Sequence, residues 1–167
     1  MAVAPEQMTV IDRWILERLH VIVNECLQAY ENFEFRKVFS AVNQFCAHDL
    51  SSLYIDMTKD RLYCDAEDDV RRRASQTALS QVFDTLVRLM APVIAFTSEE
   101  AWEHAGREGS VHEQTFPEAD ARFANGEATT LVNRLLEIRD TVQAAICLLY
   151  TSPSPRDQRG SRMPSSA

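Results

Sequence analysis

The sequence is poor in the residues that interrupt helices. Only four glycines and six prolines occur among its 167 residues, which leaves room for long helices. No apolar run approaches the ~20 residues that a membrane-spanning helix needs. No basic segment followed by an apolar one opens the chain as a secretory leader would. We therefore expect a helical protein with no membrane association and a cytoplasmic location.

Patterns typical of metal binding and catalysis are also missing. The four cysteines are widely scattered without a C-x-x-C pair, and the four histidines lack metal-ligand spacing. His112 and Glu113 begin like a zinc-protease motif, but Phe116 occupies the second histidine position. Cys26 and Cys46 fall within apolar stripes, which favours buried free thiols over a disulfide or a metal site. We predict no catalytic residue, no metal site and no cofactor in this chain.

The excess of acidic residues bears on possible partners. The chain carries 25 acidic and 17 basic residues, a formal net charge of −8. Proteins that bind nucleic acid often carry a basic face instead. Any contact with RNA must therefore come from a local group of cations on an acidic background.

Apolar residues recur at spacings of three and four along most of the chain, the period of an amphipathic helix. This period predicts helices over residues 9–30, 34–57, 69–90 and 97–106, and a fifth from about residue 127. The predicted buried stripe of the first is Ile11, Ile15, Leu19, Ile22, Cys26 and Tyr30; that of the second is Phe39, Val42, Cys46, Leu50, Leu53 and Met57; that of the fifth is Leu131, Leu135, Ile138, Val142 and Ala145.

Capping residues predict where several of these helices begin and end. Asp68 or Asp69 can cap the third helix, and Pro92 is expected to end it. Thr97 and Glu100 have the spacing of a capping box, and Gly106 suits a left-handed C-terminal cap. The polar residues 58–69 are predicted to form a loop between the second and third helices.

Three motifs, in order, resemble one family. The first is Leu-Ser-x-x-Tyr-x-Asp-x-x-Lys-Asp-Arg-Leu-Tyr over residues 50–63, and the second is Arg-Arg-x-x-Gln-Thr over 72–77. The third is Pro-x-x-x-Phe-Thr-x-Glu-Glu-x-Trp over 92–102. This series resembles the anticodon-binding domain of isoleucyl-tRNA synthetases, from about residue 12 to 146. Valyl enzymes share the last motif, whereas the Lys-Asp-Arg-Leu-Tyr run favours the isoleucyl branch.

The resemblance implies an all-α, up-and-down helix bundle of the class I synthetase anticodon-binding type. It implies a disordered N-terminal end (1–8), an anticodon-binding domain (9–146) and a non-native or disordered tail (147–167). The tail is rich in serine and proline and has no helical period. The family's His-Ile-Gly-His and Lys-Met-Ser-Lys-Ser signatures do not occur, so we expect no aminoacylation by this chain alone. In longer family members, ATP with Mg²⁺, and zinc, would belong to the missing regions.

The implied function is binding of the anticodon arm of the isoleucine tRNA, as a module beside the missing catalytic domain. Cations and an aromatic side chain in a polar segment can hold phosphates and stack on unpaired bases. The candidate RNA-binding residues are Lys59, Arg61, Tyr63, Arg72 and Arg73. Several of them have an alternative: Arg72 and Arg73 could pair with the acidic residues at 65–69, and Tyr63 and Tyr54 could equally anchor the loop to the bundle. A valyl-type domain or a helical scaffold that binds no RNA are the alternative functions.

Overall fold

The computed structural model describes residues 3–151, and these contain helices and turns without a strand. This confirms the predicted all-α class. The chain divides into two units, Met1–Thr129 and Thr130–Ala167. The long helices are α1 (Val10–Glu31), α2 (Phe35–Gln44), α3 (Asp56–Cys64), α4 (Val70–Met90), α5 (Ala95–His104) and α6 (Glu127–Thr151), with a π-helical segment η2 (Phe45–Ile55) and short 3₁₀ turns η1 (Pro5–Gln7), η3 (Val111–Glu113) and η4 (Ala121–Phe123).

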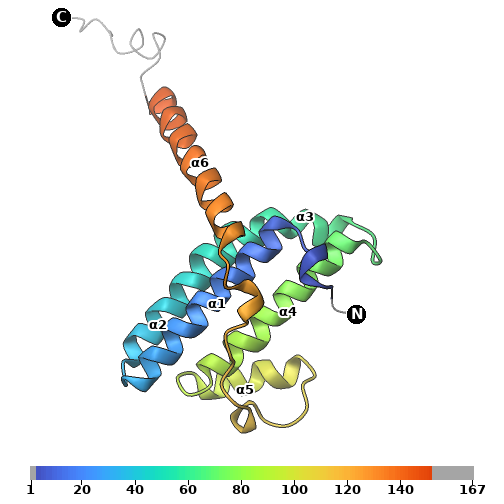
Figure 1. The fold of residues 1–167 in the computed structure, drawn as a ribbon, viewed down its shortest axis with the longest axis vertical. Helices are drawn as coiled ribbons and strands as arrows, with labels where there is room; N and C mark the ends of the chain where they lie inside the picture. Colours follow the sequence, from blue (N-terminus) through green and yellow to red (C-terminus); the bar gives the residue numbers. More distant parts are fainter. Residues whose placement is uncertain (1–2, 152–167) are drawn as a thin grey trace, which may run out of the picture. The chain divides into compact units, whose positions relative to one another are not determined.

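Helix α1 is the centre of the first unit, with α2 on one side and α4 on the other (Figure 1). Its predicted stripe is confirmed at Ile15, Leu19, Ile22 and Cys26, all of which are buried. The chain runs along α1, returns through α2, η2 and α3, and runs back along α4. This is the predicted up-and-down arrangement of a helix bundle.

The predicted loop over residues 58–69 is wrong in its first half. Helical structure continues without a break from Phe35 through η2 to Cys64, and the connection to α4 is only residues 65–69. The polarity of residues 58–64 suggested a loop, but no glycine or proline stands there to end the helix. Lys59, Arg61 and Tyr63 therefore lie on a helix and not in a loop.

The predicted buried stripe of the second helix is also partly wrong. Phe39 and Met57 are about half exposed, whereas Val38, Phe45 and Tyr54 are buried. The π-helical segment, whose hydrogen bonds join residues five apart and not four, shifts the buried face from Phe45 onward. A strict period of 3.6 residues therefore no longer predicts which residues are buried once the chain enters η2. Phe39 lies before that segment, in α2, where its neighbour Val38 is buried in its place.

The ends of α4 and α5 test the capping predictions. Asp69 caps α4, since its carboxylate accepts the backbone N–H groups of Arg71 and Arg72. The predicted capping box at Thr97 is wrong, because α5 begins at Ala95 and Thr97 already lies within its first turn. Gly106 has a φ of +67°, which confirms the predicted left-handed cap.

The predicted limits of the domain differ from the structure at both ends. Residues 3–8, expected to be disordered, include η1 and the buried Met8, so they are part of the fold. The start of α6 is fixed within the first unit by the buried Glu17, whose carboxylate accepts the N–H groups of Ala128 and Thr129. Helix α6 continues to Thr151, past the predicted start of the tail at 147, and residues 152–167 lie outside the described residues.

The predicted inner stripe of α6 is not buried. Leu131, Leu135, Ile138 and Val142 are each about half exposed. The spacing of these residues correctly predicts an amphipathic helix, but a period alone does not say what covers the apolar face. All described residues of the second unit belong to this helix.

Candidate functional site

One candidate residue, Arg61, lies beside a buried carboxylate, Asp12, near the start of α1. Asp12 is fully buried. Its Oδ1 accepts hydrogen bonds from the hydroxyls of Tyr54 at 2.7 Å and Ser75 at 2.9 Å, and its Oδ2 accepts one from the Thr9 hydroxyl at 2.6 Å. We call Thr9, Asp12, Tyr54, Arg61 and Ser75 the Asp12 cluster. Such complete pairing is what a charge removed from water requires.

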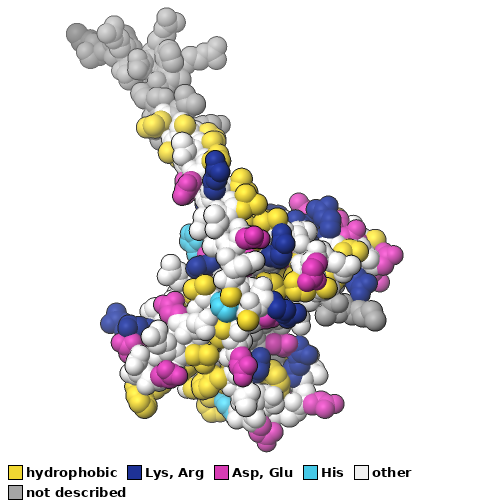
Figure 2. Space-filling view, in the orientation of Figure 1, with side chains coloured by type: hydrophobic (Ala, Val, Ile, Leu, Met, Phe, Trp, Pro, Cys, Tyr) yellow, Lys and Arg dark blue, Asp and Glu magenta, His cyan; other side chains and the backbone are white. Residues whose placement is uncertain are grey.

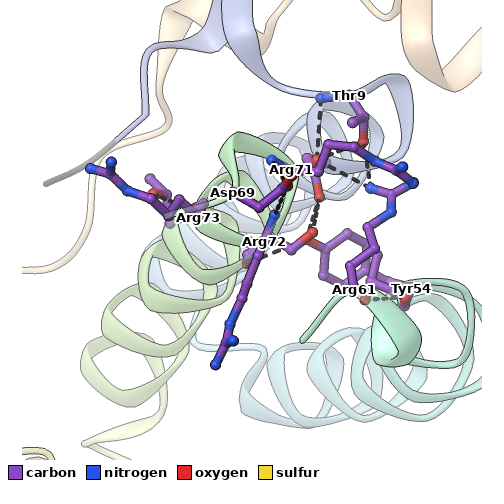
Figure 3. A network of polar contacts seen from close by, with 11 residues as sticks. Thr9, Tyr54, Arg61, Asp69, Arg71, Arg72 and Arg73 are labelled. Atoms are coloured by element: carbon purple, nitrogen blue, oxygen red, sulfur yellow. Dashed lines mark hydrogen bonds and ion pairs between the residues drawn. The ribbon is translucent and has the colours of Figure 1, made fainter. Parts of the chain in front are cut away.

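Arg61 belongs to this cluster. Its Nη1 donates to the Thr9 hydroxyl at 3.0 Å and lies 3.7 Å from Asp12 Oδ2. Figure 3 shows Arg61 and Tyr54 turned toward Thr9, whereas Arg72 and Arg73 extend away from that group. Only 18% of the Arg61 side chain is exposed, so its charge balances Asp12 within the bundle.

Burial also changes the chemistry of Tyr54. Removal from water raises the pKa of its hydroxyl far above the ordinary value, and the negative charge of Asp12 raises it further. The hydroxyl therefore remains a proton donor to Asp12 at all physiological pH values. The cluster joins α1, η2, α3 and α4 by polar contacts instead of apolar ones.

Arg72 and Arg73 lie on the first turn of α4. The Arg72 Nη1 donates to the Asp65 carbonyl oxygen at 2.8 Å, which ties α4 to the preceding connection. Arg72 therefore does pair with the acidic connection, as the alternative predicted, but the acceptor is a backbone oxygen and not a carboxylate. Asp69 uses its carboxylate for the helix cap instead. Both arginine side chains are partly exposed, which leaves surface for a ligand.

Lys59 and Tyr63 lie one turn apart on α3 and share a face of that helix. Lys59 Nζ donates to Asp56 Oδ1 at 2.8 Å, and this hydrogen bond raises the pKa of the ammonium group. Tyr63 is 85% exposed. The alternative that Tyr63 anchors this segment is therefore wrong, since a ring this exposed anchors nothing. The buried ring of Tyr54 has that role instead.

The structure thus divides the five candidates into two groups. Lys59, Tyr63, Arg72 and Arg73 reach the surface formed by α3 and the start of α4, two helices in contact with each other. Arg61 serves the interior. Figure 2 shows basic and acidic side chains intermingled over this corner of the bundle. A ligand here would meet separate cations and one aromatic ring.

Sequence reasoning missed the residues that hold this corner together. Neither Asp12 nor Ser75 was among the candidate residues. A signal was available, because Asp12 stands between Ile11 and Trp14 on the apolar side of α1. A carboxylate in that position must find buried partners, and Tyr54 and Ser75 are the ones that the fold supplies.

Other chemistry is not found in the described part of the chain. Among residues 3–151, no group of three or more His, Cys, Asp or Glu side chains is placed to hold a metal ion. No helix within that range is long and apolar enough to cross a membrane.

Comparison with known proteins identifies the family. The anticodon-binding domain of tRNA ligase matches residues 12–147. Isoleucine–tRNA ligase of Carboxydothermus hydrogenoformans is 38% identical over 144 residues, which cover 84% of this chain and 16% of that protein. Isoleucine–tRNA ligase of Thermotoga maritima is 35% identical over 145 residues, again 84% of this chain and 16% of the relative.

The chain belongs to the anticodon-binding domain family of tRNA ligases. Within that family it is similar to isoleucine–tRNA ligases, as the Lys-Asp-Arg-Leu-Tyr run indicates. It spans about one sixth of the length of these relatives, and the part that it spans is their anticodon-binding region.

Proposed function

We propose that this chain binds the anticodon arm of isoleucine tRNA through the surface of α3 and the first turn of α4. The proposal rests on the family match over residues 12–147 together with the exposed ring of Tyr63 on that surface. The names of the curated relatives support the isoleucine acceptor. The valyl-type domain remains the alternative within the same family.

Each residue of the surface has a separate task in this proposal. Lys59, Arg72 and Arg73 contact phosphates, because they are exposed or partly exposed residues of two adjoining helices. Tyr63 stacks on an unpaired base of the loop, an interaction that tolerates any base because every base has a π-face. Arg61 positions α3 against α1 through Thr9 and Asp12.

We propose that the chain performs no ligase chemistry and needs neither a nucleotide nor a metal ion for RNA binding. Attachment of an amino acid, with its ATP, Mg²⁺ and any zinc, belongs to other regions of the longer relatives. The tRNA and those regions are the proposed partners. A cytoplasmic location follows from a role in protein synthesis and stays a prediction.

Binding can be tested with an RNA hairpin that carries the isoleucine anticodon arm. We expect weak binding with a slope of log Kd against log salt that corresponds to two to four phosphate contacts, about 0.7 per contact on single-stranded RNA. Replacing Arg72 and Arg73 by alanine should flatten that slope by about one to two units. Tyr63→Ala should weaken binding by about 1–3 kcal/mol with little change of slope.

The matched control for the two arginines is Arg139→Ala, which removes an exposed arginine of α6 that pairs with Asp140. The hairpin of a valine tRNA tests the specificity, and equal affinity would favour the valyl alternative. A folded protein that binds neither hairpin at low salt would leave the helical scaffold as the better description. In that case Lys59, Arg72 and Arg73 would be ordinary surface cations.

A further inference from the structure

A row of aromatic rings lies at the opposite end of the first unit from the Asp12 cluster. The Tyr30 hydroxyl donates to the Leu89 carbonyl oxygen at 2.8 Å, which fixes the first ring against α4. The Tyr30 ring centre lies 5.9 Å from that of Phe35 and 5.1 Å from that of Phe116, and Phe33 lies 6.3 Å from Phe35. We call Tyr30, Phe33, Phe35 and Phe116 the aromatic row.

Three of these rings are unusually accessible. Phe33 is 79% exposed, Phe35 51% and Phe116 44%. The Tyr30–Phe35 and Phe33–Phe35 pairs meet edge to face, so in each pair the ring that contributes its edge keeps both of its faces clear of the other ring. Connected aromatic surface in contact with water marks a binding site more often than chance placement does.

The backbone holds the most exposed ring in place at a cost. Phe33 has a φ of +56°, in the left-handed region where glycine is normally found after a helix. The Glu34 N–H donates to the Ala29 carbonyl oxygen at 2.8 Å, and the Phe33 N–H donates to that of Tyr30 at 3.0 Å. These two bonds close the end of α1 and fix the position from which the Phe33 ring projects. Backbone strain of this kind at a residue with a large side chain is typical of functional positions.

An exposed cation follows one of the rings in sequence. Arg36 follows Phe35 in sequence, is exposed, and makes no hydrogen bond or ion pair with the described residues. Its neighbour Lys37 is paired with Glu34 at 2.7 Å. Figure 2 shows hydrophobic side chains gathered where α1 ends and α2 begins, with basic side chains close by. This corner therefore offers ring faces and an unpaired guanidinium together.

We propose that the aromatic row is a second RNA contact, which stacks unpaired bases of a single-stranded segment on Phe33 and Phe35 while Arg36 contacts a phosphate. An apolar protein partner would leave the Arg36 charge unpaired in the interface, whereas a phosphate neutralises it. The inference takes its ligand class from the proposed function but uses different residues. Helix α1, with 22 residues, separates the two surfaces by about 33 Å.

The test titrates the full chain against a labelled, unstructured RNA of about eight nucleotides, a length within the range that single-strand platforms bind. Replacing Phe33 and Phe35 together by alanine should weaken binding about 5- to 150-fold for each base stack lost. Arg36→Ala should lower the salt slope by about 0.7. Phe96→Ala is the matched control, because Phe96 is 94% exposed on α5 and is not one of the rings that contact each other in the row.

Phe33→Gly separates RNA binding from folding. Glycine relieves the left-handed conformation, so the melting temperature should rise or stay the same while RNA affinity falls as in Phe33→Ala. A variant of Phe33 and Phe35 that stays folded and binds the oligonucleotide like the parent chain overturns the inference. If the parent chain self-associates and this variant loses self-association but not RNA binding, the inference is also overturned, in favour of a protein contact.

The two RNA surfaces can fail independently. If the Arg72 and Arg73 variants lose the anticodon arm while the Phe33 and Phe35 variants bind the oligonucleotide normally, only the aromatic row is refuted. If the anticodon arm does not bind but oligonucleotide binding depends on Phe33 and Phe35, the proposed function fails and the aromatic row stands. Oligonucleotide binding that depends only on Tyr63 refutes the aromatic row.

Discussion

The two ends of the first unit solve opposite problems. At the Asp12 cluster, a charged group lies inside the protein and every polar neighbour turns inward to satisfy it. At the aromatic row, apolar rings lie outside and the backbone is strained to keep one of them there. The comparison shows that neither charge nor exposure alone identifies a binding residue. Arg61 is a cation used for structure, and Phe33 is a hydrophobic residue kept at the surface.

The largest effect should come from removing the buried carboxylate. Asp12→Ala leaves Tyr54, Ser75 and Arg61 without their shared acceptor, and we expect a loss of about 3–5 kcal/mol in the free energy of unfolding. Urea denaturation followed by circular dichroism measures it. Asp56→Ala, which removes an exposed carboxylate paired with Lys59, is the control and should change stability little. A loss below about 1 kcal/mol for Asp12→Ala would mean that the cluster does not hold the helices together.

Two tyrosines of the same corner provide the next comparison. Tyr54→Phe removes the hydroxyl that donates to Asp12 at 2.7 Å and leaves a buried acceptor less satisfied. We expect a loss of about 1–3 kcal/mol in unfolding free energy. Tyr63→Phe should leave stability unchanged, because that ring is exposed. Equal effects of the two substitutions would contradict the division between structural and surface residues.

An alkaline titration tests the end of the first unit that carries the aromatic row. Burial raises the pKa of the Cys26 thiol from 9.0 to about 11 and that of the neighbouring Tyr30 hydroxyl from 10.0 to about 12. Because the folded-state pKa is the higher one, the unfolded chain loses its proton first. The stability that the protonated Cys26 thiol contributes is complete below pH 9 and is lost as the pH rises toward 11. We expect a loss of about 1–2 kcal/mol from Cys26.

Cys26→Ala should remove that part of the pH dependence while the Tyr30 part remains. Thiol labelling gives a second measurement of the same burial. The exposed Cys64 should react quickly at pH 8, whereas Cys26 should react only when the protein opens. Equal labelling rates in the folded protein would show that the core around α1 is open to solvent.

The smallest expected effect is at Phe33. Phe33→Gly removes a left-handed conformation that costs an ordinary residue about 1–2 kcal/mol, but glycine adds entropy to the unfolded chain. We expect a net gain of about 0.5 kcal/mol, measured as a higher urea midpoint. Phe33→Ala keeps the strain and should not show the gain. A destabilised Phe33→Gly would mean that the Phe33 ring contributes packing to the fold.

Much of the fold was predictable because its causes are local. Asp69 and Gly106 mark helix ends through hydrogen bonds and backbone geometry within a few residues. The face of α1 follows from a regular period. The same reasoning failed in η2, where wider turns move the buried face, and at Thr97, where a capping pattern lies inside α5.

The candidate site was predictable only as a list of residue types. The motifs identified Lys59, Tyr63, Arg72 and Arg73 as residues worth testing, and the structure brings them to one corner. The motifs could not show that Arg61, which stands between Lys59 and Tyr63, turns inward. That direction depends on Thr9 and Asp12, which are distant in sequence and adjacent only after folding.

The sequence by itself determined the helical class, the order of the helices and the family, because period, caps and motifs are all properties of short segments. Only the tertiary structure decided which cation became structural and which aromatic ring stayed outside. Asp12 on α1 withdraws Arg61 of α3 from the surface, and the hydrogen bonds that close the end of α1 hold Phe33 in the conformation from which its ring projects. A charge or a ring takes its role from the neighbours that the fold places beside it.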